Sequence, residues 1–188
     1  MIQIKRVTNN AELEGIKKLQ EENLNINISA EEAQQQGFVS AVYSTEFLKI
    51  MHDASPSIIA VDEDVVVGYA LVSTKEIRHH HDLLADLFNA IDKINYNGID
   101  LKDANYVVVG QLCVAKNYRG KSVVQMMYQH FRDSLQNEFD YCLTDVAQAN
   151  PRSLKAHLKT GFKIVNTLTY GGISWDIILW DWTNKINN

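Results

Sequence analysis

The feature that most constrains the fold is a nearly continuous apolar run from Tyr106 to Val114. A strand with one face in water alternates apolar and polar residues, whereas a strand buried on both faces is apolar almost throughout. The run is also too short for a membrane-spanning helix, which needs about 20 apolar residues. It therefore predicts a central strand of a sheet, buried on both faces.

The spacing of apolar residues predicts further strands and helices around this central strand. Strands are expected at Ile2–Val7, Ser57–Val61, Val65–Ser73, Tyr141–Val146, Phe162–Tyr170 and Ile173–Trp182. Helices are expected through Leu13–Leu19, within Ala30–Met51, from Lys116–Tyr118 to Leu135, and from Pro151 to Gly161. Short turns at Asp62–Asp64 and Gly171–Gly172 indicate two antiparallel hairpins. The order predicts a mixed α/β fold (α+β in layout), as a single domain over residues 1–188 around one sheet.

One segment, about 74–104, interrupts this order. It holds His79-His80-His81 and a stretch in which Leu83, Leu84, Leu87 and Ile91 recur at helical spacing. Three consecutive histidines cannot all face one way on a helix or strand, which favours a solvated helix start over a metal site or a pH-sensitive lid. We expect a helical insertion and no metal ligands.

Composition excludes several classes of function. A net charge of -5, without a basic cluster, argues against binding to nucleic acid. No apolar stretch is long enough to cross a membrane, and the N-terminus lacks the pattern of a signal peptide. Cys113 and Cys142 lie in apolar runs without zinc-ligand spacing. We therefore expect a cytoplasmic protein, monomeric or homodimeric, with no nucleic acid, membrane or metal among its partners.

The segment from Val114 to Val124 joins the central strand to a helix whose first turn is expected to be basic, small and hydroxylated. The start of a helix offers unpaired backbone N–H groups and the positive end of its dipole. The junction therefore predicts an anion site, and a pyrophosphate would fit there.

The same junction, Tyr118-Arg119-Gly120-Lys121-Ser122-x-Val124, resembles the pyrophosphate loop of the GNAT acetyltransferase superfamily, Arg/Gln-x-x-Gly-x-Gly/Ala. A second segment, from Asn150 to Phe162, is similar to a later motif of that family. Two motifs at the right separation are more specific than one. The chain departs from the family at Ser122, where glycine is preferred, and at Val124, where glycine or alanine is.

The resemblance covers roughly Ser57 to Trp182, apart from the insertion. It implies a central, mostly antiparallel, splayed sheet flanked by helices, with acetyl-CoA as cosubstrate held between two strands. The cofactor-binding residues that it implies are Leu112, Cys113 and Val114 along the pantetheine arm, Arg119, Gly120, Lys121, Ser122, Val123 and Val124 around the pyrophosphate, and Asn150 and Ser153 on pantetheine. Independently, helical spacing places Asn150, Ser153 and His157 on one face of their helix.

The catalytic groups are less evident from the sequence. By resemblance, His157 stands where the family has a tyrosine that protonates the departing thiolate, and a structural or solvent-facing histidine is the alternative. Gln111 occupies a position at which relatives often carry glutamate, and an amide cannot take a proton. Water-mediated deprotonation, or a base from Glu76, Asp145 or the His79-His80-His81 cluster, is therefore open.

Two other kinds of residue invite a functional interpretation. Cys113 lies in an apolar strand with no adjacent base, so an inert thiol is the better interpretation. Trp175, Trp180 and Trp182 could line an acceptor pocket, but their place in a terminal strand favours packing against the sheet.

The predicted function is N-acetyl transfer from acetyl-CoA to a primary amine of a small molecule or peptide, and the insertion is the expected determinant of the acceptor. The alternative is a non-catalytic acyl-CoA sensor or protein-interaction module on the same fold, which Gln111, Ser122 and Val124 motivate.

Overall fold

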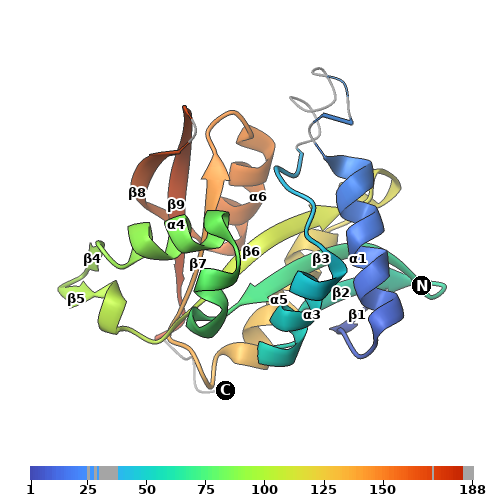
Figure 1. Ribbon diagram of the computed structural model, residues 1–188, viewed down its shortest axis with the longest axis horizontal. Coiled ribbons are helices and arrows are strands. Elements are labelled where there is room, and N and C mark those ends of the chain that lie inside the picture. The colour runs from blue at the N-terminus through green and yellow to red at the C-terminus, as the bar shows by residue number, and fades with distance from the viewer. Residues whose placement is uncertain (25, 28, 30–37, 171, 184–188) are drawn as a thin grey trace.

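The computed structural model describes residues 1–188 apart from 25, 28, 30–37, 171 and 184–188, and Figure 1 shows its mixed α/β architecture. One sheet has the strand order β1-β2-β3-β6-β7-β9-β8, and a small two-stranded sheet joins β4 to β5. In the large sheet only β6 and β7 are paired in parallel, and all other neighbours are antiparallel. The mixed, mostly antiparallel sheet expected from the sequence is confirmed.

The strands lie close to their predicted positions. Their bounds are β1 Gln3–Arg6, β2 Ile58–Asp62, β3 Val65–Ser73, β4 Asn95–Tyr96, β5 Ile99–Asp100, β6 Tyr106–Val114, β7 Tyr141–Ala147, β8 Lys163–Tyr170 and β9 Ile173–Asp181. The apolar run that predicted the central strand is β6, which lies between β3 and β7. Both predicted hairpins, β2–β3 and β8–β9, are present.

The helices differ more from expectation. They are α1 Asn10–Asn23, α3 Thr45–Ala54, α4 Asp82–Ile91, α5 Val123–Leu135 and α6 Pro151–Thr160, with short 3-10 helices η1 Lys75–His80, η2 Leu101–Asp103 and η3 Lys116–Tyr118. The helix expected within Ala30–Met51 lies later, at α3, and residues 30–37 of that range lie outside the described part of the chain. Within the described residues, no helix combines the length and the apolar character that a membrane crossing needs.

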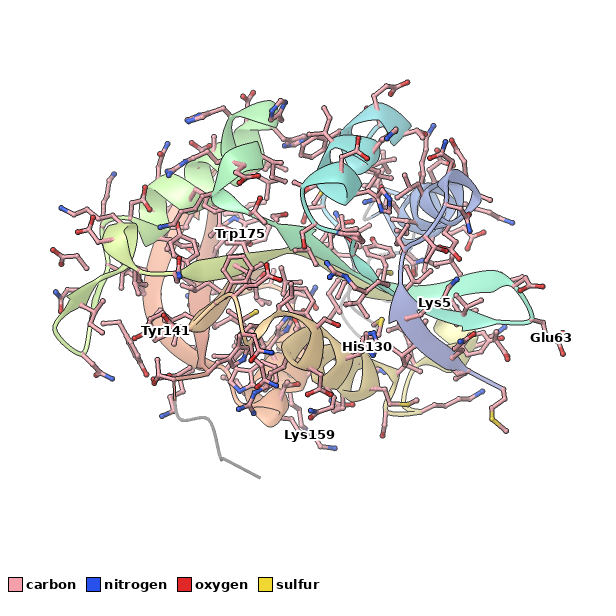
Figure 2. The ribbon with its side chains drawn as sticks, turned by 90° about the horizontal axis from the view of Figure 1, so that it is seen from below. Lys5, Glu63, His130, Tyr141, Lys159 and Trp175 are labelled. Carbon is pink, nitrogen blue, oxygen red and sulfur yellow. The ribbon has the colours of Figure 1, made fainter. Side chains whose placement is uncertain are left out.

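Both faces of the sheet are buried, as the central strand predicts. Along β6, Tyr106 and Val108 pack into one apolar cluster with α1, α3 and α4, while Val107 and Val109 pack into a second cluster with α5. Figure 2 shows α1, α3 and α4 on one side of the sheet and α5 with α6 on the other. This alternation explains why the strand is apolar almost throughout.

The sheet splays open between its two parallel strands. The β6–β7 register holds for Tyr106↔Tyr141, Val107↔Cys142 and Val108↔Leu143 and then ends, although both strands continue. On its other side, β6 has a register irregularity against β3 between Ala70 and Val72. The sheet is therefore open along the later half of β6, which is the half that approaches the loop into α5.

The insertion expected at about 74–104 consists of η1, α4, the β4–β5 hairpin and η2. Its helix α4 buries Leu84, Leu87, Phe88 and Ile91 against the sheet. The triple histidine does not form one surface, because His79 and His80 lie exposed in η1 while His81 caps α4. The ring of His81 stacks on Phe47 at 5.3 Å between centroids and accepts a hydrogen bond from the Leu83 N–H at 3.3 Å.

Candidate active site

The loop between β6 and α5 differs from the prediction that the helix would begin near Tyr118. Residues Lys116–Tyr118 form η3 instead, and α5 begins only at Val123. The delay has a backbone cause, since Gly120 (φ 79°) and Ser122 (φ 60°) both adopt left-handed conformations that no α-helix contains. Serine is strained there while glycine is not, which gives a physical reason for glycine at this position in relatives.

Ser122 is the N-cap residue of α5, and its side chain makes no capping hydrogen bond. The first-turn amides of Val123, Val124 and Gln125 therefore have no side-chain cap. Free amides at the positive end of a helix dipole attract an anion. The geometry thus agrees with the predicted anion site, with the free amides one turn later than expected.

These amides border a cleft of about 390 Å³. Its wall holds four cationic side chains, Arg119, Arg152, Lys155 and Lys159, and no carboxylate among the described residues. Lys159 lies on the α5 and α6 side of the sheet in Figure 2. A wall of this charge complements a polyanion such as the phosphates of acetyl-CoA.

Arg119 is fixed at the entrance to this cleft. Its Nε donates to the carbonyl of Val114 at 2.9 Å, and its Nη2 donates to Oδ1 of Asn23 on α1. The remaining nitrogen, Nη1, is buried without a hydrogen-bond partner in the described structure. A buried donor without a partner is unfavourable, and an acceptor oxygen from a ligand would satisfy it. The residues present therefore fit a phosphate-bearing group.

A second, smaller cavity of about 120 Å³ lies at the opening between β6 and β7. It shares wall residues with the cleft, namely Phe38, Val39, Leu112, Asn150 and Ser153. The rest of its wall comes from residues 40–43, α4, the later half of β6, the end of β7, His157 of α6 and the β8–β9 hairpin. The two spaces meet at the splay of the sheet, so a ligand along the cleft would reach the cavity.

The charge of this cavity is opposite to that of the cleft. Among the described residues, its ionisable side chains are Asp86 at the exposed rim, Asp145 from β7, His157 and Tyr43, with no Lys or Arg. Burial raises the pKa of Asp145 to about 6. Asp145 forms no ion pair with a cation in the described part of the chain. Asp145 is therefore a half-buried carboxylate on the wall of a small space, with a higher proton affinity than an ordinary aspartate.

His157 lies deeper than the predicted helix-surface histidine, at 3% exposure. Its Nδ1 lies 2.8 Å from the carbonyl oxygen of Ser153, which can only accept, so Nδ1 carries the proton. Tyr128 and Phe162 pack edge-on against the ring at 5.4 Å between centroids. Burial lowers the pKa of His157 to about 4, so at neutral pH the imidazole is neutral and its Nε2 has no proton to give. These features favour the structural interpretation of His157.

Gln111 lines the cavity, and its side-chain amide is hydrogen-bonded through both its oxygen and its nitrogen. Its Oε1 accepts from the Tyr69 hydroxyl at 2.6 Å and from Gln20 Nε2 at 2.8 Å, and its Nε2 donates to the Ala41 carbonyl at 2.9 Å. Gln20 in turn accepts from the backbone N–H of Tyr43 at 3.0 Å. The two glutamines therefore hold Ala41 and Tyr43, which form part of the cavity wall.

The three tryptophans have different surroundings. Trp182 is fully buried, and Trp180 packs 5.5 Å from it, so both follow the packing interpretation. Trp175 lines the cavity instead, beside Leu168, its register partner on β8. Its indole N–H is buried and has no hydrogen-bond partner among the residues that the structure describes. For Trp175 the pocket interpretation, which the sequence ranked second, fits the structure.

The residues that the sequence assigned to the cofactor gather around the cleft. Its wall contains Leu112, Cys113, Val114, Arg119, Gly120, Ser122, Val123, Val124, Asn150 and Ser153, but not Lys121. Lys121 lies over the ring of Tyr118 at 5.2 Å. Cofactor contacts of these residues stay a prediction, because the structure establishes only that they surround one space.

Several candidate residues had no sequence signal. Asn23, Phe38, Val39 and Gln20 reach the site from the α1–α3 region, which contains no recognisable motif. Their positions depend on tertiary packing over long sequence separations. Asp145 on β7, by contrast, was named from the sequence as one of several open candidates for a base.

Cys113 and a metal site can be assessed from the same geometry. Cys113 is a free, buried cysteine, and burial raises the pKa of its thiol to about 12, so it is not a nucleophile at neutral pH. Within the described residues, no group of His, Cys, Asp or Glu side chains is arranged to hold a metal ion.

Solved structures share this fold at low identity. A chain of the NatC complex bound to Gag peptide and CoA superposes with a TM-score of 0.66 at 16% identity, covering 96% of this chain and 98% of that one. A GNAT acetyltransferase from Streptococcus agalactiae gives 0.65 at 15% identity, covering 96% and 95%. Arabidopsis thaliana NAA60 in complex with acetyl-CoA gives 0.61 at 16% identity, covering 96% and 99%.

The sequence matches none of the curated proteins with which it was compared. It does match the Acetyltransferase (GNAT) family over residues 22–162, which include β6, the loop into α5 and all of α6. This range contains both motifs on which the resemblance rested. The chain belongs to the GNAT acetyltransferase family.

Proposed function

We propose that this protein transfers an acetyl group from acetyl-CoA to a primary amine of a small molecule or peptide. The observation that carries the proposal is the junction of two spaces, a cleft lined by cations and a cavity lined by carboxylates. They share a wall at the point where β6 and β7 separate. This arrangement suits a polyanionic donor and a cationic acceptor that must meet.

The cleft residues have a direct role in holding the donor. Acetyl-CoA supplies an acetyl group already activated as a thioester. Arg119, Lys155 and Lys159, with the free amides of α5, would bind its phosphates, and the strand from Leu112 to Val114 would line its pantetheine arm. These contacts position the donor and need no side chain to change its protonation.

Asp145 is the proposed general base. An amine in neutral water is mostly an ammonium ion, and it must lose a proton before its nitrogen lone pair can attack. Of the candidates left open by the sequence, Glu76, His79 and His80 are exposed on η1 and lie outside the described cavity wall. Asp145 lines the cavity, and its pKa of about 6 leaves it ionised at neutral pH yet more basic than an ordinary carboxylate.

We also propose a cytoplasmic location. The support is chemical: Cys113 and Cys142 are both unpaired thiols, as is usual in a reducing compartment. Fractionation of the native protein, with its free thiols counted by alkylation, tests this statement.

The proposed activity is tested by incubating the protein with acetyl-CoA and a pooled library of primary amines. Thermal stabilisation reports binding of the donor, and release of free CoA that depends on an acceptor reports transfer. We expect both. Stabilisation without release on any acceptor would support the acyl-CoA sensor instead, and absence of stabilisation would exclude both functions and favour a structural interaction domain.

A further inference from the structure

The cavity next to the splay has an electrostatic character that restricts its ligand. Asp145 and Asp86 are the groups on its described wall that are charged at neutral pH, because His157 is buried and neutral. Neither carboxylate makes an ion pair or a hydrogen bond with a cation in the described part of the chain. The described wall therefore carries two negative charges and no cation that balances them.

The two carboxylates occupy different depths. Asp145 belongs to β7 and lies on the face of the sheet that α4 covers, since its neighbours Leu143 and Ile177 are in that apolar cluster. Asp86 projects from α4 itself and is exposed at the rim. A cation entering past Asp86 would move toward Asp145, whereas a carboxylate would be repelled at both positions.

The remainder of the cavity wall is largely apolar. The apolar and aromatic side chains on it are Phe38, Val39, Ala41, Tyr43, Leu83, Leu84, Leu87, Leu112, Val146, Ala147, Leu168 and Trp175. The space is small, about 120 Å³. For scale, an engineered apolar cavity of about 150 Å³ binds benzene. An aryl group or a short branched alkyl chain fits such a wall better than a polar chain does.

On the basis of the proposed function, we infer that the acceptor is a small primary amine with an apolar body and no carboxylate near its nitrogen. The ammonium group replaces the missing counter-charge of Asp145 and Asp86. The apolar body contacts the leucines of α4 and Trp175. The insertion thus selects two properties of the acceptor. Asp86 favours its positive charge, and the leucines of α4 favour its apolar body.

This inference distinguishes three kinds of acceptor. A free amino acid carries a carboxylate on the carbon next to the amine, so its negative charge would lie beside Asp145. A peptide with a free N-terminus has a neutral carbonyl there, but its chain must leave a cavity that holds only a small group. A simple aralkyl or alkyl amine has neither disadvantage.

The test uses acceptors matched in shape. Initial rates of CoA release are measured with 2-phenylethylamine, phenylalaninamide, phenylalanine and the peptide Phe-Gly-Gly, at saturating acetyl-CoA and pH 7.5. We expect kcat/KM to be highest for the amine, lower for the neutral amide and at least about tenfold lower again for the amino acid, since its charge lies near two carboxylates. A higher kcat/KM for phenylalanine or for the peptide than for the amine would overturn the inference.

A pair of variants on α4 tests the role of Asp86. In Asp86→Asn, the ratio of kcat/KM for 2-phenylethylamine to that for phenylalanine should fall about threefold, because one repelling charge at the rim is lost. Asp82→Asn makes the same charge change on the same helix outside the described cavity wall, and should leave the ratio unchanged. An equal fall in both variants, or none in Asp86→Asn, contradicts the inference.

The outcomes separate this inference from the proposed function. Absence of CoA release with every acceptor would be a failure of the proposed function. Release with amino acids or peptides in preference to amines would leave acetyl transfer intact and overturn only the acceptor class.

Discussion

The cleft and the cavity are adjacent, yet they are assembled in opposite ways. The cleft presents Arg119, Arg152, Lys155 and Lys159, and most of its wall comes from two short segments, 112–125 and 150–159. The cavity presents two carboxylates, and its wall comes from six segments, namely 38–43, 83–87, 110–112, 144–147, 150–157 and the β8–β9 hairpin. The donor side is therefore built locally and the acceptor side by long-range packing.

The difference also concerns how each space uses charge. The cleft gathers cations and free helix amides around a space that is open to water, so its interaction with an anion should weaken as salt is added. The cavity instead holds the half-buried Asp145, whose desolvation raises its proton affinity. The cleft thus attracts an anionic ligand, whereas the cavity raises the proton affinity of Asp145, the proposed base.

The largest expected effect comes from removing the base. Asp145→Asn keeps the shape of the side chain and abolishes its proton affinity, so kcat/KM should fall by about 10²- to 10⁴-fold. Because Asp145 must be ionised to act, wild-type kcat/KM should rise with pH through about 6 and then level off. The variant should lose that rising limb while its affinity for acetyl-CoA stays unchanged.

The matched control for this experiment is Asp133→Asn, an exposed position on α5. It should match the wild type in rate and in pH profile. If Asp145→Asn retained the wild-type rate and the rise of kcat/KM near pH 6, the cavity would not supply the base. The proposed separation of donor binding in the cleft from base catalysis in the cavity would then be wrong.

The next effect belongs to the cleft. Arg119→Gln removes a half-buried cation whose buried Nη1 has no partner in the described structure, and one charged hydrogen bond contributes about 1.5–3 kcal/mol. The dissociation constant for acetyl-CoA, measured by calorimetry, should therefore rise about 10- to 100-fold. Lys121→Gln, outside the described wall of the cleft, should change it little. Equal effects of the two changes would show that acetyl-CoA is attracted by the overall positive charge of this region and not by the specific position of Arg119 in the cleft.

The same contrast explains how much of the structure the sequence could predict. The central strand was predicted to the residue because burial on both faces leaves an unbroken apolar run. Helix α6 was predicted because Pro151 and Gly161 mark its ends. The predicted start of α5 was wrong because the left-handed conformation of Ser122 has no signal in the sequence, unlike a glycine, which often marks such a conformation.

For the candidate site, the donor side could be predicted and the acceptor side could not. Ten of the eleven residues assigned to the cofactor surround the cleft, and they lie within two contiguous motifs. The cavity depends on α4 reaching the ends of β7 and β9, which are more than 50 residues away in the sequence. No periodicity or spacing within either segment specifies that contact.

A smaller effect should come from the glutamine network that holds the shared wall. In Gln111→Glu, an ionised carboxylate could still accept from Tyr69 and Gln20, but it could not donate to the Ala41 carbonyl. The wall should loosen, and the KM for the amine should rise about three- to tenfold at pH 8, the range of one lost hydrogen bond. At low pH, a protonated glutamate can donate again, so the defect should shrink as pH falls.

Gln111→Met is the comparison for this prediction, because it removes the same hydrogen bonds at every pH. Its defect in KM, expressed relative to the wild type, should not vary with pH. A pH-independent defect in Gln111→Glu, or no defect at all, would mean that the hydrogen bond from Gln111 to the Ala41 carbonyl does not hold the cavity wall in place.

The smallest effect on rate is expected at His157, which lines the cavity one turn after the shared residue Ser153. Since its Nδ1–H is committed to the Ser153 carbonyl and its pKa is lowered to about 4, His157→Phe should keep kcat within about twofold of the wild type. Its effect on stability should depend on pH. In the unfolded chain the imidazole takes up a proton near pH 6.5, whereas in the folded protein His157 does so only near pH 4. As the pH falls from 6.5 to 4, this difference lowers the free energy of unfolding of the wild type by about 1.4 kcal/mol per pH unit.

Phenylalanine has no imidazole to protonate, so His157→Phe does not lose this stability. Its free energy of unfolding, measured in urea, should therefore increase relative to that of the wild type as the pH is lowered from 7 to 5. Phenylalanine can keep the edge-on contacts with Tyr128 and Phe162, which makes folding of the variant a fair expectation. A fall in kcat of about 100-fold, with stability following the wild type at every pH, would instead identify His157 as the acid that protonates the thiolate. His157 would then supply a proton to the reaction besides forming part of the cavity wall.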